Sequence, residues 1–360
     1  MAMEFMMIEK LKKLIKESDF DAVLIMSPEN RFYFTGFNSS DGFLLANEND
    51  AVFVTDSRYI EAAQNTIKDC KVVLQERSAA QLKDILYGLG AKTVAVEADR
   101  LTVANYTRFS GVLEGMELIA DGTLDSGINE IRSIKEPQEL EKIRTAQSIA
   151  EKAFEHICNF IKEGKTEKEI QLELDYYMLS HGAEGLSFET IAVSGANGSM
   201  PHGVPSDKPV KRGELITMDY GALFEGYHSD MTRTVAMGEV NDEQKLIYNT
   251  VLKAQLAAIE AIKAGVTGKA ADAAARDLIK NAGFGEYFGH GTGHGVGVEI
   301  HEYPNVSPAN EKPLKAGNVV TAEPGIYIPG KYGVRIEDMV FVTENGCKNL
   351  TECPKELIIL

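Results

Sequence analysis

An internal repeat restricts the fold of this chain more than any other feature does. Residues 161–168 (IKEGKTEK) match residues 262–269 (IKAGVTGK) at a shift of 101 positions. In each copy the pattern predicts a helix ending at glycine, a threonine that caps the next helix, and a second glycine where that helix ends. Two copies at so long a period indicate a duplicated, pseudo-symmetric domain, not a solenoid. A chance resemblance between two helix-loop-helix segments is the alternative that the residues leave open.

Each half of the repeat also carries two carboxylates in segments that read as strands. Residues 215–234 are typical of two strands joined by a turn at 224–227, and each strand holds one Asp. Aspartate is depleted from strands, and a buried carboxylate must be paired or bound to a cation. The second half repeats the pattern with two glutamates. We expect these four carboxylates to converge around a pseudo-twofold axis: Asp219 and Asp230 from the first half, Glu323 and Glu337 from the second.

Four converging carboxylates cannot all stay ionised in a core without cations, because their like charges repel. Two divalent ions remove the repulsion, and a two-metal site activates water and polarises a carbonyl. The glycine-rich run 288–297 (FGHGTGHGVG) supplies the imidazoles that usually accompany such ligands. It fits neither a dinucleotide-binding fingerprint nor a Walker motif. Four histidines lie in such Gly/Pro-rich loop or strand-edge segments: His202, His290, His294 and His301.

Composition limits the class of protein. With 54 acidic and 37 basic side chains, the net charge is −17, which argues against a nucleic-acid or anionic-membrane partner. The four cysteines include no Cys-x-x-Cys pair and are expected to be free thiols in a reducing compartment. Neither a secretory signal nor an apolar run long enough to span a membrane is visible. We expect a cytoplasmic protein.

A chain of 360 residues is expected to form two domains. The first half mixes helix and strand patterns, which predicts an α/β domain over 1–129. Pro137 suits the first turn of a new helix over 139–161, so the second domain is expected to span 130–360. In the first domain the pattern predicts helices at 8–15, 59–64 and 79–89, and strands at 22–26, 43–46, 51–54, 72–74 and 93–96.

From about residue 131 to the end, the chain resembles the "pita-bread" metallopeptidases, and among them the Xaa-Pro peptidases, aminopeptidase P and prolidase. The resemblance rests on the motifs MDYG, HSDMTRT, HGTGHGVG, IHE, AEPGIY and VRIED. Less specifically, NRFYFTG at 30–36 and TDSRY at 55–59 resemble the creatinase-type N-terminal domain. The implied architecture is a creatinase-like α/β domain followed by an α+β pita-bread domain.

The resemblance implies a role for each candidate residue. Asp230 and Glu337 would bridge two metal ions, most often Mn or Co, with Fe or Zn as alternatives. Glu323 would also act as general base and acid. His202 and His301 would hydrogen-bond the substrate or its oxyanion. Asp219 would complete the ligand shell of one ion. The shell of the other ion would be completed by His294 and Glu323. His290 and Arg335 would orient ligands and contact substrate.

The choice within the family depends on one position. Archaeal and eukaryotic prolidases are expected to carry an Arg shortly after the IHE motif, where this chain has Asn305. That departure favours an Xaa-Pro aminopeptidase, acting on short peptides with proline in second position, over a prolidase that cleaves Xaa-Pro dipeptides. A non-catalytic pita-bread binding module is the remote alternative, disfavoured because every ligand position is filled. The resemblance also implies a homodimer.

Overall fold

The computed structural model describes residues 2–76 and 80–360 and divides the chain into two compact units, one ending at Arg132 and one comprising Ser133–Leu360. The predicted boundary after residue 129 falls inside helix α6 (Thr123–Ser133), and the units divide after Arg132. Within the described residues, no helix is both long enough and apolar enough to cross a bilayer.

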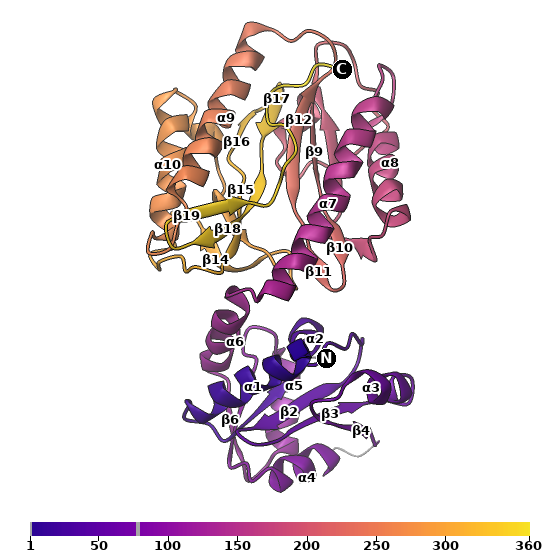
Figure 1. Cartoon of the computed structure of the whole chain (residues 1–360), viewed down its shortest axis with the longest axis vertical. Coiled ribbons are helices and arrows are strands. Elements are labelled where there is room, and N and C mark those ends of the chain that lie inside the picture. The colour runs from indigo at the N-terminus through magenta and orange to yellow at the C-terminus, as the bar shows by residue number, and fades with distance from the viewer. Residues whose placement is uncertain (1, 77–79) are drawn as a thin grey trace. The chain divides into compact units, whose positions relative to one another are not determined.

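The first unit is built on a six-stranded mixed sheet with strand order β4-β3-β2-β1-β5-β6 (Figure 1). The β1–β2 and β2–β3 pairs are antiparallel and the other three pairs are parallel. The strands are β1 (Ala22–Ile25), β2 (Phe43–Asn47), β3 (Ala51–Thr55), β4 (Lys71–Leu74), β5 (Thr93–Val96) and β6 (Glu117–Ile119). The helices are α1 (Ala2–Lys16), α2 (Pro28–Thr35), α3 (Ile60–Thr66), α4 (Ala80–Gly88), α5 (Val103–Val112) and α6.

All five strands and all three helices predicted in this unit are present, although Ala79, the first residue of the predicted helix 79–89, lies outside the described residues. The main miss is α2, where no helix was predicted. Ser27 caps it by accepting from the Asn30 amide, Pro28 occupies its first turn, and Gly36 ends it at φ 66°. Ser27 and Pro28 thus begin a helix here. The buried residues of α2 show no clear 3.6-residue period that would have predicted it. The helices α5 and α6 and strand β6 were also missed.

The second unit shows the predicted duplication. Helices α7 (Pro137–Phe160) and α8 (Glu167–Ser180) flank one side of its strands, and α9 (Asp242–Ala261) and α10 (Gly268–Asn281) flank the other (Figure 1). Thr166 and Thr267 cap α8 and α10 through their side chains, as expected. Each also forms an isolated antiparallel bridge with a proline, Pro209 in the first copy and Pro313 in the second.

The first helix of each copy ends before its glycine, at Phe160 and Ala261, so that detail of the prediction was wrong. The next residue in each copy, Ile161 or Ile262, takes an extended backbone and is fully buried. Burial of that isoleucine is favourable enough to end the helix early. The glycines lie in the following turn at φ 89° (Gly164) and 84° (Gly265).

The strands of the second unit form two main sheets, β12-β9-β8 and β14-β13-β15-β18-β19, and two small ones, β11-β10-β7 and β16-β17. Their bounds are β7 (Gly185–Leu186), β8 (Ile191–Ser194), β9 (Leu215–Tyr220), β10 (Ala222–Phe224), β11 (Tyr227–His228), β12 (Met231–Ala236), β13 (Gly293–Gly295), β14 (Glu302–Val306), β15 (Val319–Ala322), β16 (Gly325–Ile328), β17 (Tyr332–Arg335), β18 (Asp338–Thr343) and β19 (Gly346–Asn349).

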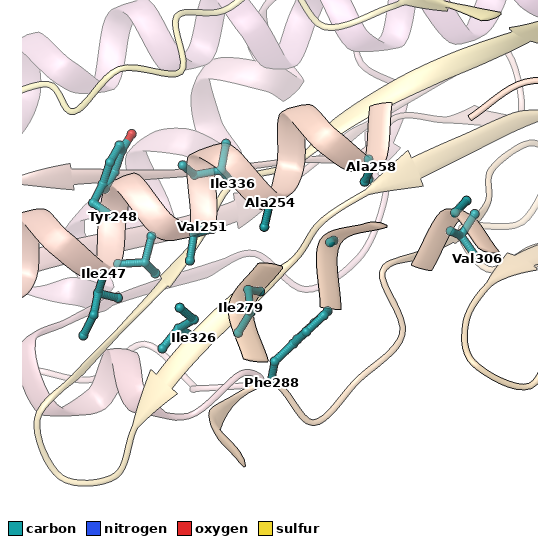
Figure 2. Close-up of a cluster of buried hydrophobic side chains, with 14 of the residues drawn as sticks. Ile247, Tyr248, Val251, Ala254, Ala258, Ile279, Phe288, Val306, Ile326 and Ile336 are labelled. Atoms are coloured by element: carbon teal, nitrogen blue, oxygen red, sulfur yellow. The ribbon is translucent and has the colours of Figure 1, made fainter. Parts of the chain in front are cut away.

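One apolar cluster packs α9 and α10 against the strands of the second copy. Ile247, Val251 and Ala254 follow one face of α9 at helical spacing. Figure 2 shows this face turned toward Ile279 of α10 and Ile326 of β16. All five side chains are fully buried, so the strands that carry the second pair of carboxylates rest on a rigid layer.

Candidate active site

The strands of the second unit break where the predicted carboxylates lie. Asp230 stands between β11 and β12, Glu323 between β15 and β16, and Glu337 between β17 and β18, while Asp219 is the last residue but one of β9. The sequence pattern placed all four within strands. In a continuous strand, successive side chains point to opposite faces of the sheet. Because Asp230, Glu323 and Glu337 lie outside the strands, their side chains do not follow this alternation and can point toward one centre.

The break after β9 depends on Gly221. A Cβ at that position would lie 1.9 Å from the carbonyl oxygen of Ser229. The close approach lets the chain leave β9 and start β10 while β12 keeps its pairing with β9, in which Asp219 faces Thr232. The turn at 224–227 is present as predicted, with Glu225 and Gly226 both at positive φ.

The predicted metal ligands do come together. Asp230, His294 and Glu337 each offer one ligand atom, and these three atoms lie within 4.8 Å of one another. His294 Nε2 is 3.5 Å from Asp230 Oδ2 and 3.3 Å from Glu323 Oε1. Asp219 belongs to the same centre, because its charge acts on the pKa of Asp230 and of Glu337.

The protonation of this cluster reflects crowded, buried charge. Burial, and then repulsion by neighbouring carboxylates, hold the pKa values of Asp230 and Glu337 well above the ordinary range. Burial also raises the pKa of Asp219, although Arg335 opposes it. Burial alone would raise the pKa of Glu323, but its hydrogen bond and charge interaction with His294 lower it. These directions show that the ionised forms of Asp230 and Glu337 are disfavoured in this crowded, buried cluster.

Three oxygen atoms at this centre are buried and have no hydrogen-bond partner among the described residues: Asp219 Oδ1, Asp230 Oδ1 and Glu337 Oε1. Buried carboxylate oxygens without partners are costly unless a cation meets them. The Nδ1 of His294 lies 3.1 Å from the Gly295 carbonyl, which can only accept, so Nδ1 carries the proton and Nε2 faces the carboxylates. This donor set, rich in oxygen with one imidazole nitrogen, fits divalent metal ions.

A buried network fixes one side of the centre. Arg335 donates to Asp219 Oδ2 at 2.5 Å and to the hydroxyl of Tyr327 at 2.8 Å. The Nδ1 of His290 donates to the Gly291 carbonyl, so its Nε2 accepts from the Tyr327 hydroxyl at 2.9 Å. The predicted orienting residues His290 and Arg335 are therefore joined, and the link between them, Tyr327, was not assigned from the sequence although it ends the AEPGIY motif.

A second residue that the sequence did not single out is Thr232. Its hydroxyl donates to Glu337 Oε2 at 2.7 Å and accepts from Arg335 Nε at 3.1 Å. It therefore fixes Glu337 from the first half of the repeat. Thr232 occupies the MTRT run beside Asp230, but a buried threonine in a strand gives no sequence signal of such a role.

The carboxylates and histidines line one cavity of about 870 Å³ in the second unit. Its wall contains all of the predicted site residues, together with apolar side chains that include Phe188 and Ile300. His202 and His301 are exposed to solvent in it, and burial and the charge of His294 lower the pKa of His301. Asn305 and Lys168 also line the wall. The predicted catalytic, substrate-binding and ligand residues thus share one space.

Comparison with family models decides where this arrangement belongs. Residues 141–344 match the model of metallopeptidase family M24, and residues 7–134 match the creatinase/prolidase N-terminal domain. The chain belongs to metallopeptidase family M24. The expected fold class, a creatinase-type domain followed by a pita-bread domain, is confirmed, and so is the expectation of a metallo-exopeptidase.

Individual relatives cover the whole length of this M24 chain. The Xaa-Pro dipeptidase of Pyrococcus furiosus is 40% identical over 98% of this chain and 99% of its own. The structure of an Xaa-Pro dipeptidase from Bacillus anthracis superposes with a TM-score of 0.94 at 41% identity, covering 99% of this chain and 100% of that one. The structure of an X-Pro aminopeptidase from Thermotoga maritima gives 0.91 at 41% identity, covering 98% and 99%.

Proposed function

We propose that this M24 peptidase hydrolyses the peptide bond between an N-terminal residue and proline. The observation that carries the proposal is the convergence of four carboxylates and His294 in one cavity with exposed His202 and His301. Relatives that match the chain over nearly its full length are named as Xaa-Pro dipeptidases or an X-Pro aminopeptidase, which supports the same bond.

Asp219, Asp230, His294, Glu323 and Glu337 would hold two divalent ions. We propose Mn as the native metal, because the donor set is four carboxylates to one imidazole and oxygen donors suit Mn. When bound, the ions would supply a nucleophile from water and polarise the scissile carbonyl. The unpartnered oxygens of Asp219, Asp230 and Glu337 are the ones available for them.

The remaining groups act on the substrate and its protons. Glu323 lines the cavity and would accept a proton and return it to the leaving nitrogen. His202 and His301 face the cavity and would donate hydrogen bonds to the carbonyl oxygen as negative charge develops on it.

Proline in second position makes a special demand on such a site. The nitrogen of an Xaa-Pro bond carries no hydrogen, so a peptidase cannot hold it through an N–H contact. The cavity instead offers apolar side chains, and Phe188, Ile191 and Ile300 line it together with the histidines. An apolar wall of this kind suits a pyrrolidine ring.

Within this activity we propose an aminopeptidase acting on Xaa-Pro-Yaa peptides. Asn305, which stands where a prolidase Arg is expected, lines the cavity, so a neutral side chain lies where a dipeptide would need a cation for its carboxylate. The dipeptidase is the second candidate, because Lys168 also lines the cavity. Its ammonium donates to the side-chain oxygen of Gln171 at 2.8 Å, and among the described residues no carboxylate lies within 4.0 Å of it.

The test is paired hydrolysis by chelator-stripped enzyme with Mn restored, using an Xaa-Pro dipeptide and an Xaa-Pro-Yaa tripeptide. We expect the tripeptide to have the higher kcat/KM, and N305R to shift preference toward the dipeptide. K168A tests the second candidate, with the exposed Lys162→Ala as its control. Dipeptide preference in the wild type that K168A abolishes would replace the aminopeptidase proposal by the dipeptidase. Absence of hydrolysis with Mn and with Co would overturn both.

A further inference from the structure

A buried ion pair lies directly beside one of the proposed substrate-binding histidines. Lys135 Nζ contacts Glu302 Oε1 at 2.5 Å, and the two side chains are 1% and 3% exposed. Glu302 follows His301 in the chain and begins β14. Nothing in the proposed mechanism uses this pair. A wholly buried pair adds little net stability compared with apolar residues of the same size, so its placement calls for another explanation.

The carboxylate of Glu302 supports the loop that leads to His301. Its second oxygen accepts from the amide of Glu299 at 3.4 Å, and a Cβ on Gly297 would come within 2.4 Å of the first. The backbone of Gly297 therefore rests against this carboxylate. The Gly297 amide in turn donates to the Glu299 carbonyl at 3.1 Å, which closes the loop into a tight turn. The position of Glu302 thus sets the path of residues 297–301.

Lys135 is also held in place by hydrogen bonds of its own chain segment. The amide of Lys135 donates to the Gly317 carbonyl at 2.9 Å, and the Asn318 side chain donates to the carbonyl of Ser133 at 2.9 Å. The ammonium also acts on buried Glu139, whose pKa burial raises and Lys135 lowers. The segment between α6 and α7 therefore supplies a cation whose backbone is held in place and whose ammonium meets Glu302.

We propose that Lys135, through Glu302, is a positioning residue for His301. The imidazole of His301 projects from the end of the supported loop, with its ring centroid 4.3 Å from that of His294. A small shift of this loop would move the imidazole away from the substrate carbonyl oxygen to which it would donate. Such misplacement lowers the rate of catalysis. This inference rests on the proposed role of His301 in hydrolysis.

Two variants of the full-length enzyme test the proposal. K135M/E302Q removes both charges together and so avoids a buried unpaired charge, and E302D keeps the charges but retracts the carboxylate by one methylene. We expect each to lower kcat roughly 10-fold with a smaller change in KM, as for other groups that orient an active-site residue. The matched control is K208M/E214Q, which neutralises a half-buried pair at 2.7 Å whose residues do not line the cavity.

The second readout is the imidazole itself, followed by NMR of metal-free protein with ¹³C-labelled histidine. The His301 resonance, assigned with H301A, should shift in both variants, while that of His181, exposed at the end of α8, should not. Wild-type kcat and an unshifted His301 resonance in E302D would overturn the proposal, even if the double variant fails to fold. If the wild type cleaves no Xaa-Pro peptide, the proposed function fails, and the NMR result still decides whether the pair positions His301.

Discussion

Arg335 donates to Oδ2 of Asp219 at 2.5 Å, while Oδ1 of the same carboxylate is buried and has no hydrogen-bond partner in the part of the chain that the structure describes. One oxygen of Asp219 is thus fixed by the protein, and the other is the one that the proposed cation would meet. The guanidinium is itself held by the Tyr327 hydroxyl. The orientation of a proposed metal ligand therefore depends on a tyrosine that lies outside the ligand set.

Replacing Tyr327 by Phe should lower metal affinity and kcat, each by roughly 10-fold, because Arg335 loses one of its acceptors and His290 loses the donor to its Nε2. Chelator competition and steady-state kinetics measure the two effects. Y248F is the matched control, since the buried Tyr248 hydroxyl donates to the carbonyl of Lys355. It should cost stability without changing metal affinity. Equal metal affinity in Y327F and wild type would contradict the role given to Tyr327.

Metal ions should stabilise the wild type against heat, because they bind the folded cluster and not the unfolded chain. At 100 times the Kd the gain is about 2.7 kcal/mol. In metal-free protein, D230N should be at least as stable as the wild type. The substitution removes a carboxylate whose ionised form is disfavoured by burial and by repulsion from its neighbours. D230N should gain little from Mn. Calorimetric melts with and without Mn give both quantities.

The ligand assignment has its own decisive variant. Asp230→Ala should abolish Mn-dependent hydrolysis while leaving the protein folded. Full Mn-dependent activity in a folded D230A protein would show that Asp230 is not a ligand.

Replacing Gly221 by Ala should be severely destabilising, because the new Cβ would lie 1.9 Å from a backbone carbonyl that side-chain rotation cannot move. Overpacking of this kind costs about 1–3 kcal/mol or more. G111A is the control: nothing lies within 4 Å of its Cβ, and it sits inside α5, where Ala is favoured over Gly by roughly 0.5–1 kcal/mol. Urea denaturation should therefore give changes of opposite sign for the two variants.

The four cysteines should react slowly with thiol reagents in the folded enzyme at pH 8. Burial raises the pKa to about 11 for Cys158 and Cys347 and to about 12 for Cys70 and Cys353, so the thiolate is scarce. Titration with Ellman's reagent should give four fast thiols only after denaturation. A rapidly reacting thiol in the native enzyme would contradict these environments.

The sequence was sufficient for the duplication, the fold class and the peptidase family, because each rests on local patterns such as capping threonines and adjacent motifs. It did not show that the strands end beside Asp230, Glu323 and Glu337. The end of a strand depends on tertiary contacts, such as the close approach of Gly221 to the Ser229 carbonyl, which no sequence pattern displays. It also missed α2, where Ser27 and Pro28 start a helix.

Roles that depend on long-range contacts were likewise beyond the sequence. Tyr327 acts through a hydrogen bond to His290, 37 positions away, and Thr232 through one to Glu337, 105 positions away, while Lys135 meets Glu302 across 167 positions of chain. No period or motif encodes such a pairing. The ligand assignments, the native metal, the homodimer and the cytoplasmic location stay predictions.

The two copies of the repeat have diverged unequally. Both keep a capping threonine, Thr166 or Thr267, and a turn glycine with nearly the same backbone angle. At the centre they differ, for β13 of the second copy brings a histidine, whereas β8 of the first brings only aliphatic and hydroxyl side chains. If the five proposed ligands hold two ions, the two metal positions therefore differ in their donor atoms, and the two ions should leave the enzyme one after the other as chelator is added.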